Sequence, residues 1–120
     1  MDVLLLLTFL MIKHAIADLF LQTYHTVGNK HIYISLSHRH YAEHAVLTLL
    51  VCLFFTTPLL AVVVAVLDYV LHWHIDFAKH RLINRYNVKR NSNQFFKIQA
   101  FDQILHYLTY ALIVFILMLQ

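Results

Sequence analysis

Three histidine–aspartate pairs, each with a spacing of four residues, are the part of this sequence with the clearest chemical potential. The pairs are His14 with Asp18, His72 with Asp76 and, in reverse order, Asp102 with His106. Residues four apart lie on one face of a helix, so each pair would present an imidazole and a carboxylate in the same direction. The reversed third pair reaches the same depth if its helix runs the opposite way. The pattern predicts one polar site built from several helices.

Imidazole and carboxylate side chains inside a helical bundle are a known way to bind metal ions. This mixture suits zinc, iron or manganese better than copper. The predicted metal ligands are His14, Asp18, His44, His72, Asp76, Asp102 and His106. They outnumber the four ligands of one tetrahedral zinc ion, so the sequence predicts either two ions or a set in which some residues only orient the ligands.

Hydrolysis is the chemistry that such a centre would favour, because a metal with an open coordination position activates water. Catalytic roles are predicted for Asp18, Asp76, Asp102 and Lys79. Roles in orienting ligands or binding substrate are predicted for Gln22, Lys30 and Gln103. Lys79 and Arg81 would meet an anionic group at the mouth of the site.

The same residues are also consistent with a polar network that binds no metal. Histidine and aspartate can satisfy each other's hydrogen bonds, and such networks hold membrane helices together or conduct protons. The chain contains no nucleophilic serine elbow, phosphate-binding glycine loop or dinucleotide-binding pattern. Its single cysteine, Cys52, excludes an intrachain disulfide framework and is expected in the core.

The composition is that of a helical membrane protein. Hydrophobic residues make up 61% of the 120 residues and charged residues only 12%, against about 45–50% and about a quarter in soluble domains. Glycine and proline occur once each, as Gly28 and Pro58. We therefore expect a single all-α domain over residues 1–120 that is embedded in the lipid bilayer.

The apolar segments predict four transmembrane helices, over residues 3–23, 42–57, 58–82 and 100–119. A spanning helix needs about 20 residues. One straight helix through residues 42–82 would be about 60 Å long, so a tight hairpin at Pro58 is favoured, with a kinked single helix as the alternative. A cleavable signal peptide is the alternative for the first segment, but Asp2 stands where a positive charge is usual.

Positive charge predicts the orientation. The linkers 24–41 and 79–99 hold eight of the nine Lys and Arg residues, so both are expected in the cytoplasm. The exception, Lys13, is expected to snorkel or to pair with a carboxylate. Cations gathered between helices do not form a nucleic-acid-binding face. The histidines of the first linker and its border, His25, His31, His38 and His40, are predicted to be solvated.

In its motifs the chain resembles a family of small membrane proteins from bacteria and phages, the domain of unknown function numbered 3307. The resemblance is carried by His14, Asp18 and Gln22 in HAIADLFLQ, by Lys30 and His44, by His72, Asp76 and Lys79 in HWHIDFAK, and by Asp102, Gln103 and His106 in FDQILH. Departures from the family pattern are Lys13, Leu19 and His74. The resemblance implies a polytopic protein of the bacterial inner membrane and brings no established activity.

The function that these observations favour is a metal-dependent hydrolase acting on a lipid-linked or membrane-proximal substrate. A channel- or transporter-like relay of protons or cations would use the same groups. A phage effector that acts through helix contacts, in superinfection exclusion or as a holin, is the third hypothesis. Association of several copies of the chain is compatible with all three.

Overall fold

The computed structural model describes residues 1–23 and 27–120. These residues form four long helices: α1 (Val3–Ile16), α3 (His38–Cys52), α4 (Pro58–Arg85) and α5 (Asn93–Met118). The first helix continues as a single π-helical turn, η1 (Ala17–Leu21). The all-α, four-helix prediction is confirmed.

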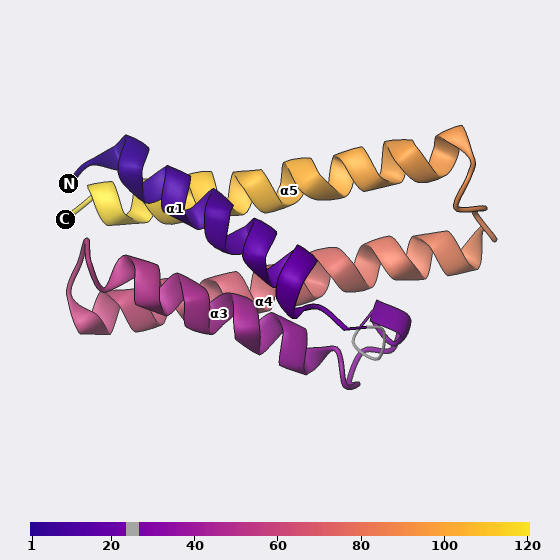
Figure 1. The fold of residues 1–120 in the computed structure, drawn as a ribbon, viewed down its shortest axis with the longest axis horizontal. Coiled ribbons are helices and arrows are strands. Elements are labelled where there is room, and N and C mark those ends of the chain that lie inside the picture. The colour runs from indigo at the N-terminus through magenta and orange to yellow at the C-terminus, as the bar shows by residue number, and fades with distance from the viewer. Residues whose placement is uncertain (24–26) are drawn as a thin grey trace.

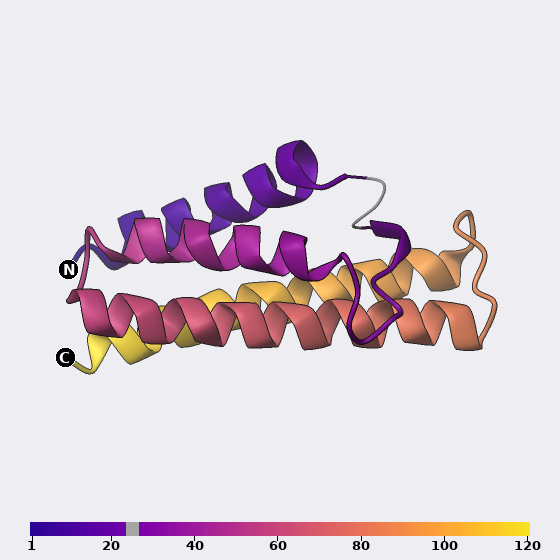
Figure 2. The same cartoon turned by 90° about the horizontal axis from the view of Figure 1, so that it is seen from below.

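The helices form a closed bundle in which each contacts two neighbours, in the order α1, α3, α4, α5 and back to α1. Both termini and the turn between α3 and α4 lie at one end, and the connection between α4 and α5 lies at the other (Figure 1). The α4–α5 hairpin extends beyond the ends of α1 and α3 (Figures 1 and 2). The bundle therefore has one end where all four helices meet and one end where only two continue.

In the part of the chain that the structure describes, three helical segments are long and apolar enough to cross a membrane, namely Val3–Leu21, Pro58–Arg85 and Asn93–Met118. They indicate a multi-pass protein associated with the lipid bilayer. The outward surfaces agree, because large apolar side chains such as Leu4, Phe54 and Leu59 are more than three-quarters exposed. Such surfaces are stable only against lipid or another apolar partner.

The remaining helix, α3, is displaced toward the N-terminus relative to the prediction. It begins at His38 and ends at Cys52, whereas the sequence predicted a span over 42–57. Its 15 residues are about 22 Å long, and its first two turns are polar. The predicted hairpin is present, since residues 53–57 form the turn and Pro58 occupies the first helical position of α4, where its missing N–H costs nothing.

Local capping explains the other helix boundaries. The side chain of Asp2 accepts a hydrogen bond of 3.0 Å from the backbone N–H of Leu5, which satisfies a free donor at the start of α1. Ser92 caps α5 in the same way through the N–H of Phe95, at 3.2 Å. This cap starts α5 at Asn93 and not at residue 100 as predicted, and it lengthens the α4–α5 hairpin.

The interior is divided along its length into an apolar and a polar part. The apolar core lies toward the end that carries both termini and consists of Leu6, Leu10, Cys52, Ala61, Val64, Tyr110, Ile113, Val114 and Leu117. The polar part begins on the next turns of the same helices and contains the histidine–aspartate pairs. Cys52 is fully buried in the apolar part, as expected.

Candidate metal centre in the polar layer

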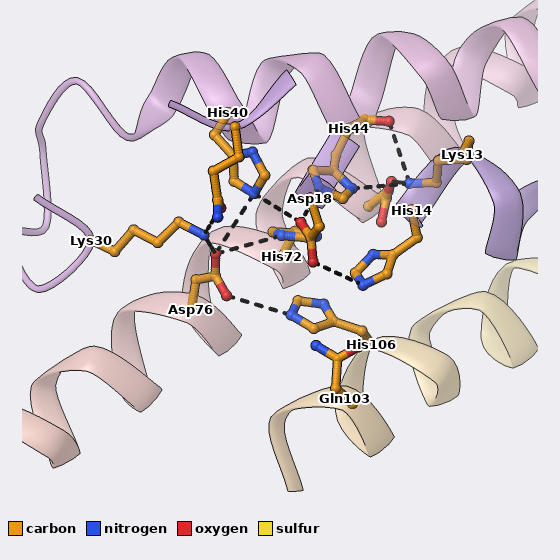
Figure 3. Close-up of polar contacts among 12 residues, drawn as sticks. Lys13, His14, Asp18, Lys30, His40, His44, His72, Asp76, Gln103 and His106 are labelled. Atoms are coloured by element: carbon orange, nitrogen blue, oxygen red, sulfur yellow. Dashed lines mark hydrogen bonds and ion pairs between the residues drawn. The ribbon is translucent and has the colours of Figure 1, made fainter. Parts of the chain in front are cut away.

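The structure brings together the four histidines that the sequence predicted as ligands. His72 of α4 lies at the centre of the group and is 1% exposed. Its ring centroid is 3.7 Å from that of His44, 4.1 Å from that of His106 and 5.7 Å from that of His14. Figure 3 shows these rings converging from different helices. We refer to one set of residues as the polar layer: His14, His40, His44, His72, His106, Asp18, Asp76 and Asp102.

Asp18 projects into the polar layer from the π-helical turn. The backbone N–H of Gln22 bonds the carbonyl of Ala17 at 3.0 Å, five residues back, and such wide turns often occur at functional sites. The carboxylate of Asp18 accepts a hydrogen bond from His44 Nε2 at 3.0 Å. It also lies 3.2 Å from His14 Nε2 and 3.3 Å from His40 Nε2. Its side chain is 26% exposed, the most open of the four carboxylates that face the bundle interior.

The other two predicted carboxylates, Asp76 and Asp102, are neutralised by lysines. Lys30 Nζ lies 2.5 Å from Asp76. Lys79 Nζ donates to Asp102 at 2.8 Å and lies 3.6 Å from Asp76. His106 Nε2 is placed between the two acids, 3.5 Å from Asp76 and 3.6 Å from Asp102. The second and third predicted motifs therefore meet around Asp76.

The predicted glutamines support these ion pairs. Lys30 donates to Gln22 Oε1 at 2.7 Å, and Gln103 Nε2 donates to Asp102 at 3.2 Å. Lys30 is buried although it belongs to the linker. The two amides thus fix the lysine of one pair and the carboxylate of the other.

One turn deeper, Lys13 of α1 pairs with Asp68 of α4. The two charged atoms are 2.6 Å apart, and the two side chains are 3% and 1% exposed. Thr48 donates a further hydrogen bond of 2.5 Å to the same carboxylate, and Lys13 Nζ lies 4.7 Å from the ring centre of Tyr110. Of the two predictions for Lys13, pairing with a carboxylate is therefore correct and snorkelling is wrong.

Charge is almost balanced across the bundle interior. Lys13, Lys30 and Lys79 offset Asp68, Asp76 and Asp102. Among the described residues, Asp18 forms ion pairs only with histidines. With neutral imidazoles the interior therefore carries one uncompensated negative charge, and it resides on Asp18.

Among the described residues, three groups of side chains have ligand atoms close enough together to hold a metal ion, within 4.8 Å of one another. They are Asp18, His40, His44 and His72; His14, His72 and His106; and Asp76, Asp102 and His106. The first and third groups share no residue, so two ions fit without competing. A tetrahedral zinc ion needs ligand atoms about 3.4 Å apart, so small side-chain movements would close the first group around it.

Several ring nitrogens of the polar layer have no hydrogen-bond partner among the described residues. Both nitrogens of His72 and Nδ1 of His40 are buried in this condition. The Nε2 atoms of His14 and His40 also form no hydrogen bond, although each lies within 3.3 Å of the Asp18 carboxylate. A buried polar atom without a partner costs about 1–3 kcal/mol. A metal ion uses such nitrogen lone pairs directly, so this donor set fits a metal. His14 is also oriented as a ligand would be, because its Nδ1 lies 2.7 Å from the hydroxyl oxygen of Tyr110.

Comparison with known families agrees with the motifs. The family model described as "Protein of unknown function (DUF3307)" matches residues 6–120. The chain belongs to the DUF3307 family. No curated protein and no solved structure matches it. The resemblance inferred from the sequence is confirmed. Because the family is described as of unknown function, the function of this DUF3307 protein has to be inferred from its site residues.

His40 is the residue of the polar layer that the sequence analysis missed. It was predicted to be solvated in the linker, but α3 of this DUF3307 protein begins at His38, and His40 is fully buried. Its ring centroid lies 4.6 Å from that of His44 and 5.3 Å from that of His72. The signal that could have identified it is its spacing of four residues from His44, the spacing that singled out the aspartate pairs.

The remaining predictions for this DUF3307 protein have mixed outcomes. His38 is half-buried, with Nδ1 2.5 Å from the hydroxyl of Tyr69, so its prediction as a solvated linker residue is wrong. His31 is half-buried in the wall of a polar cavity, and His25 lies outside the described residues. Arg81, predicted at the mouth of the site, is exposed and lies over the ring of Phe77 instead.

Proposed function

We propose that this protein binds a divalent metal ion through Asp18, His40, His44 and His72, and that it uses the ion to hydrolyse a substrate at the cytoplasmic face of the membrane. The observation that supports this most directly is the environment of His72. Its ring is almost fully buried, neither of its nitrogens has a hydrogen-bond partner among the described residues, and two further imidazoles and a carboxylate lie within metal-binding reach.

Charge supports the same ligand group. Burying a cation is costly unless opposite charge offsets it. Within residues 1–23 and 27–120, Asp18 is the interior carboxylate that has no lysine partner. Three nitrogen ligands and one carboxylate oxygen suit zinc, and iron or manganese are the alternatives. The third group, Asp76, Asp102 and His106, already has Lys79 as its cation, so we assign it a supporting role.

Catalysis requires that the ion be reached by substrate. Asp18 and Asp76 both line a polar cavity of about 540 Å³ that opens on the side of the α4–α5 hairpin. When bound, a divalent ion would supply the Lewis acid for hydrolysis. Asp76 lies 3.6 Å from His72 and lines the same cavity, so its supporting role would be to orient the His72 ring.

The orientation belongs to the proposal. With the linkers 24–41 and 79–99 in the cytoplasm, the cavity opens to the cytoplasm and the apolar core faces the opposite leaflet. We include the short helix α3 as the fourth helix of the transmembrane bundle, because His40, Tyr41 and His44 of its polar first turns are buried against the other helices. Arg39 of the same turns is exposed and would lie at the level of the lipid headgroups.

Elemental analysis of the purified protein tests the metal. Wild-type protein should contain about one zinc, iron or manganese ion per chain, as expected for one tetrahedral site, and His72→Ala should contain none. His74→Ala is the matched control, because His74 lies on the same helix but is exposed. Wild-type protein that holds no stoichiometric metal, even after loading with each ion, would overturn the proposal.

A proton relay is a second candidate, favoured by the continuity of the imidazoles. Successive ring centroids along His40, His44, His72, His106 and His14 are 4.6, 3.7, 4.1 and 5.1 Å apart. Beyond His14 and the Lys13–Asp68 pair, the interior becomes the apolar core, which is why we rank the relay second. It predicts proton flux in liposomes that requires no metal and is lost in Asp18→Asn.

A further inference from the structure

The polar cavity beside the metal centre has the walls of an anion-binding site. It is lined by η1, by residues 27–31, by the cytoplasmic half of α4 and by the start of α5. Asp18 and Asp76 form its inner wall. Asn84 follows Asp76 by eight residues on α4 and therefore lies about 12 Å further from the apolar core. The cavity is thus a passage from the polar layer toward the α4–α5 connection.

Among the described residues, the cations Lys30, Lys79 and Arg90 line this passage. Their charges are balanced, because Asp18 and Asp76 also line the cavity and Asp102 pairs with Lys79. A divalent ion on Asp18 would shift this balance toward positive charge. An ammonium group has three N–H donors. Lys30 and Lys79 each use two of them in the contacts to carboxylates and Gln22 described above, which leaves one donor of each for a ligand.

Neutral donors complete the lining. The side-chain amides of Gln22, Asn84, Gln99 and Gln103 face the cavity, together with the imidazoles of His31 and His80. Lysine, arginine and amide donors around one space suit the oxygens of a phosphate group, which accept several charge-assisted hydrogen bonds. Arg90 is exposed, and no ion pair of it is found among the described residues.

The depth of the cavity indicates where its ligand comes from. The linker beside it exposes Ile32, Ile34 and Leu36 at 47%, 78% and 67%. Between them, Tyr33 packs on Trp73 with ring centroids 4.4 Å apart, and its carbonyl accepts a hydrogen bond of 3.0 Å from the Trp73 indole. Tryptophan and tyrosine prefer the membrane–water interface. Trp73 is adjacent to His72, so the polar layer lies near this interface. Asp76 and Lys79 follow Trp73 on α4 by three and six residues, so the inner part of the cavity lies at the level of the lipid headgroups.

We propose that the cavity binds the phosphate group of an anionic molecule presented at the inner leaflet, with Lys79 on the inner side and Arg90 at the mouth. This assignment rests on the proposed function for turnover, in that the bound phosphate ester would be the substrate class of the metal centre. Binding itself needs only the cations and amides of the cavity, so it can be measured without the metal.

The test is a binding measurement on purified full-length protein in detergent, with a chelator present. The probes are a short-chain phosphatidic acid, a short-chain phosphatidylcholine of the same tails, and inorganic phosphate. Wild-type protein should bind phosphatidic acid tightest, and Arg90→Gln should weaken that binding about tenfold, because one charge-assisted contact is lost. Arg81→Gln, which removes the same charge from an exposed position outside the cavity, should bind as wild type does.

The outcomes separate the two proposals. Equal affinity for phosphatidic acid and phosphatidylcholine, or equal weakening in Arg90→Gln and Arg81→Gln, overturns the phosphate site. Inorganic phosphate that binds as tightly as phosphatidic acid overturns the lipid source. Specific binding of phosphatidic acid in the absence of any metal supports the cavity even if elemental analysis shows that the proposed metal centre is wrong.

Discussion

The imidazole rings of His44 and His72 lie 3.7 Å apart, centroid to centroid, with 35° between their planes, although one belongs to α3 and the other to α4. Two buried imidazoles at this distance cannot both be protonated without strong repulsion. His44 Nε2 already donates to Asp18, whereas His72 has no hydrogen-bond partner among the described residues. The pair therefore fixes the register of α3 against α4 and leaves His72 available to a ligand.

His40 should contribute to metal binding as strongly as the residues that the motifs identify. We expect His40→Ala to weaken metal affinity by about 100-fold or more, since changes that only disturb the support of a ligand cost about 10–100-fold. Competition with a chromogenic chelator measures the affinity. His38→Ala, two residues earlier and directed at Tyr69, is the control. Unchanged affinity in His40→Ala would remove His40 from the ligand group.

The Lys13–Asp68 pair should be costly to break from one side only. Asp68→Leu or Lys13→Met alone leaves a buried, uncompensated charge and should lower the free energy of unfolding by about 3–5 kcal/mol. The double variant should recover most of this loss, because an apolar pair needs no charge compensation. Reversible unfolding in mixed micelles measures the difference. A double variant as unstable as the sum of the single variants would contradict this account.

Neutralising Asp76 should destabilise metal-free protein far more than neutralising Asp18. Asp76→Asn leaves Lys30 without its partner and should destabilise the fold by about 3–5 kcal/mol. Asp18→Asn removes the carboxylate that has only histidine partners and should change stability by less than about 1 kcal/mol. Thermal unfolding in detergent with a chelator compares the two variants. Equal destabilisation by both would show that Asp18 is compensated in another way.

The proposed topology can be checked with single cysteines. In a Cys52→Ala background, cysteines at Gly28 and at Asn91 should react with a membrane-impermeant thiol reagent only from the cytoplasmic side, and one at Thr57 only from the opposite side. All three positions are exposed in the bundle, and Cys52 itself is fully buried. Reaction of positions 28 and 57 from the same side would exclude α3 as a membrane-crossing helix.

The sequence predicted those parts of the site that follow from spacing within one helix. The pairs His14–Asp18, His72–Asp76 and Asp102–His106 could be identified because a period of four residues is a property of the helix itself. Pro58 likewise marked the hairpin. The start of α3 was missed because the residues from His38 to Tyr41 are polar, and polarity without an apolar period was interpreted as a linker.

The contacts between helices could not be read in the same way. That Lys13 meets Asp68 depends on the relative rotation of α1 and α4, and no spacing along the chain records such a rotation. The burial of Lys30 could not be predicted for the same reason. A linker residue can be recognised as interior only once its carboxylate partner on α4 is known. The start of α5 depends on the cap at Ser92. A serine in the sequence does not by itself identify the start of a helix when the position of the neighbouring helix is unknown.

The shortness of α3 has a consequence for the surrounding lipid. Only the part from Ala45 to Cys52 is an apolar helix, about 12 Å long, whereas the hydrocarbon layer is about 30 Å thick. A mismatch of this kind is relieved when acyl chains beside the short segment bend or the bilayer thins locally. The bilayer next to α3 would therefore be locally thinned. Aqueous solvent would then approach the imidazoles from the side of the bundle as well as from the end that carries the α4–α5 connection.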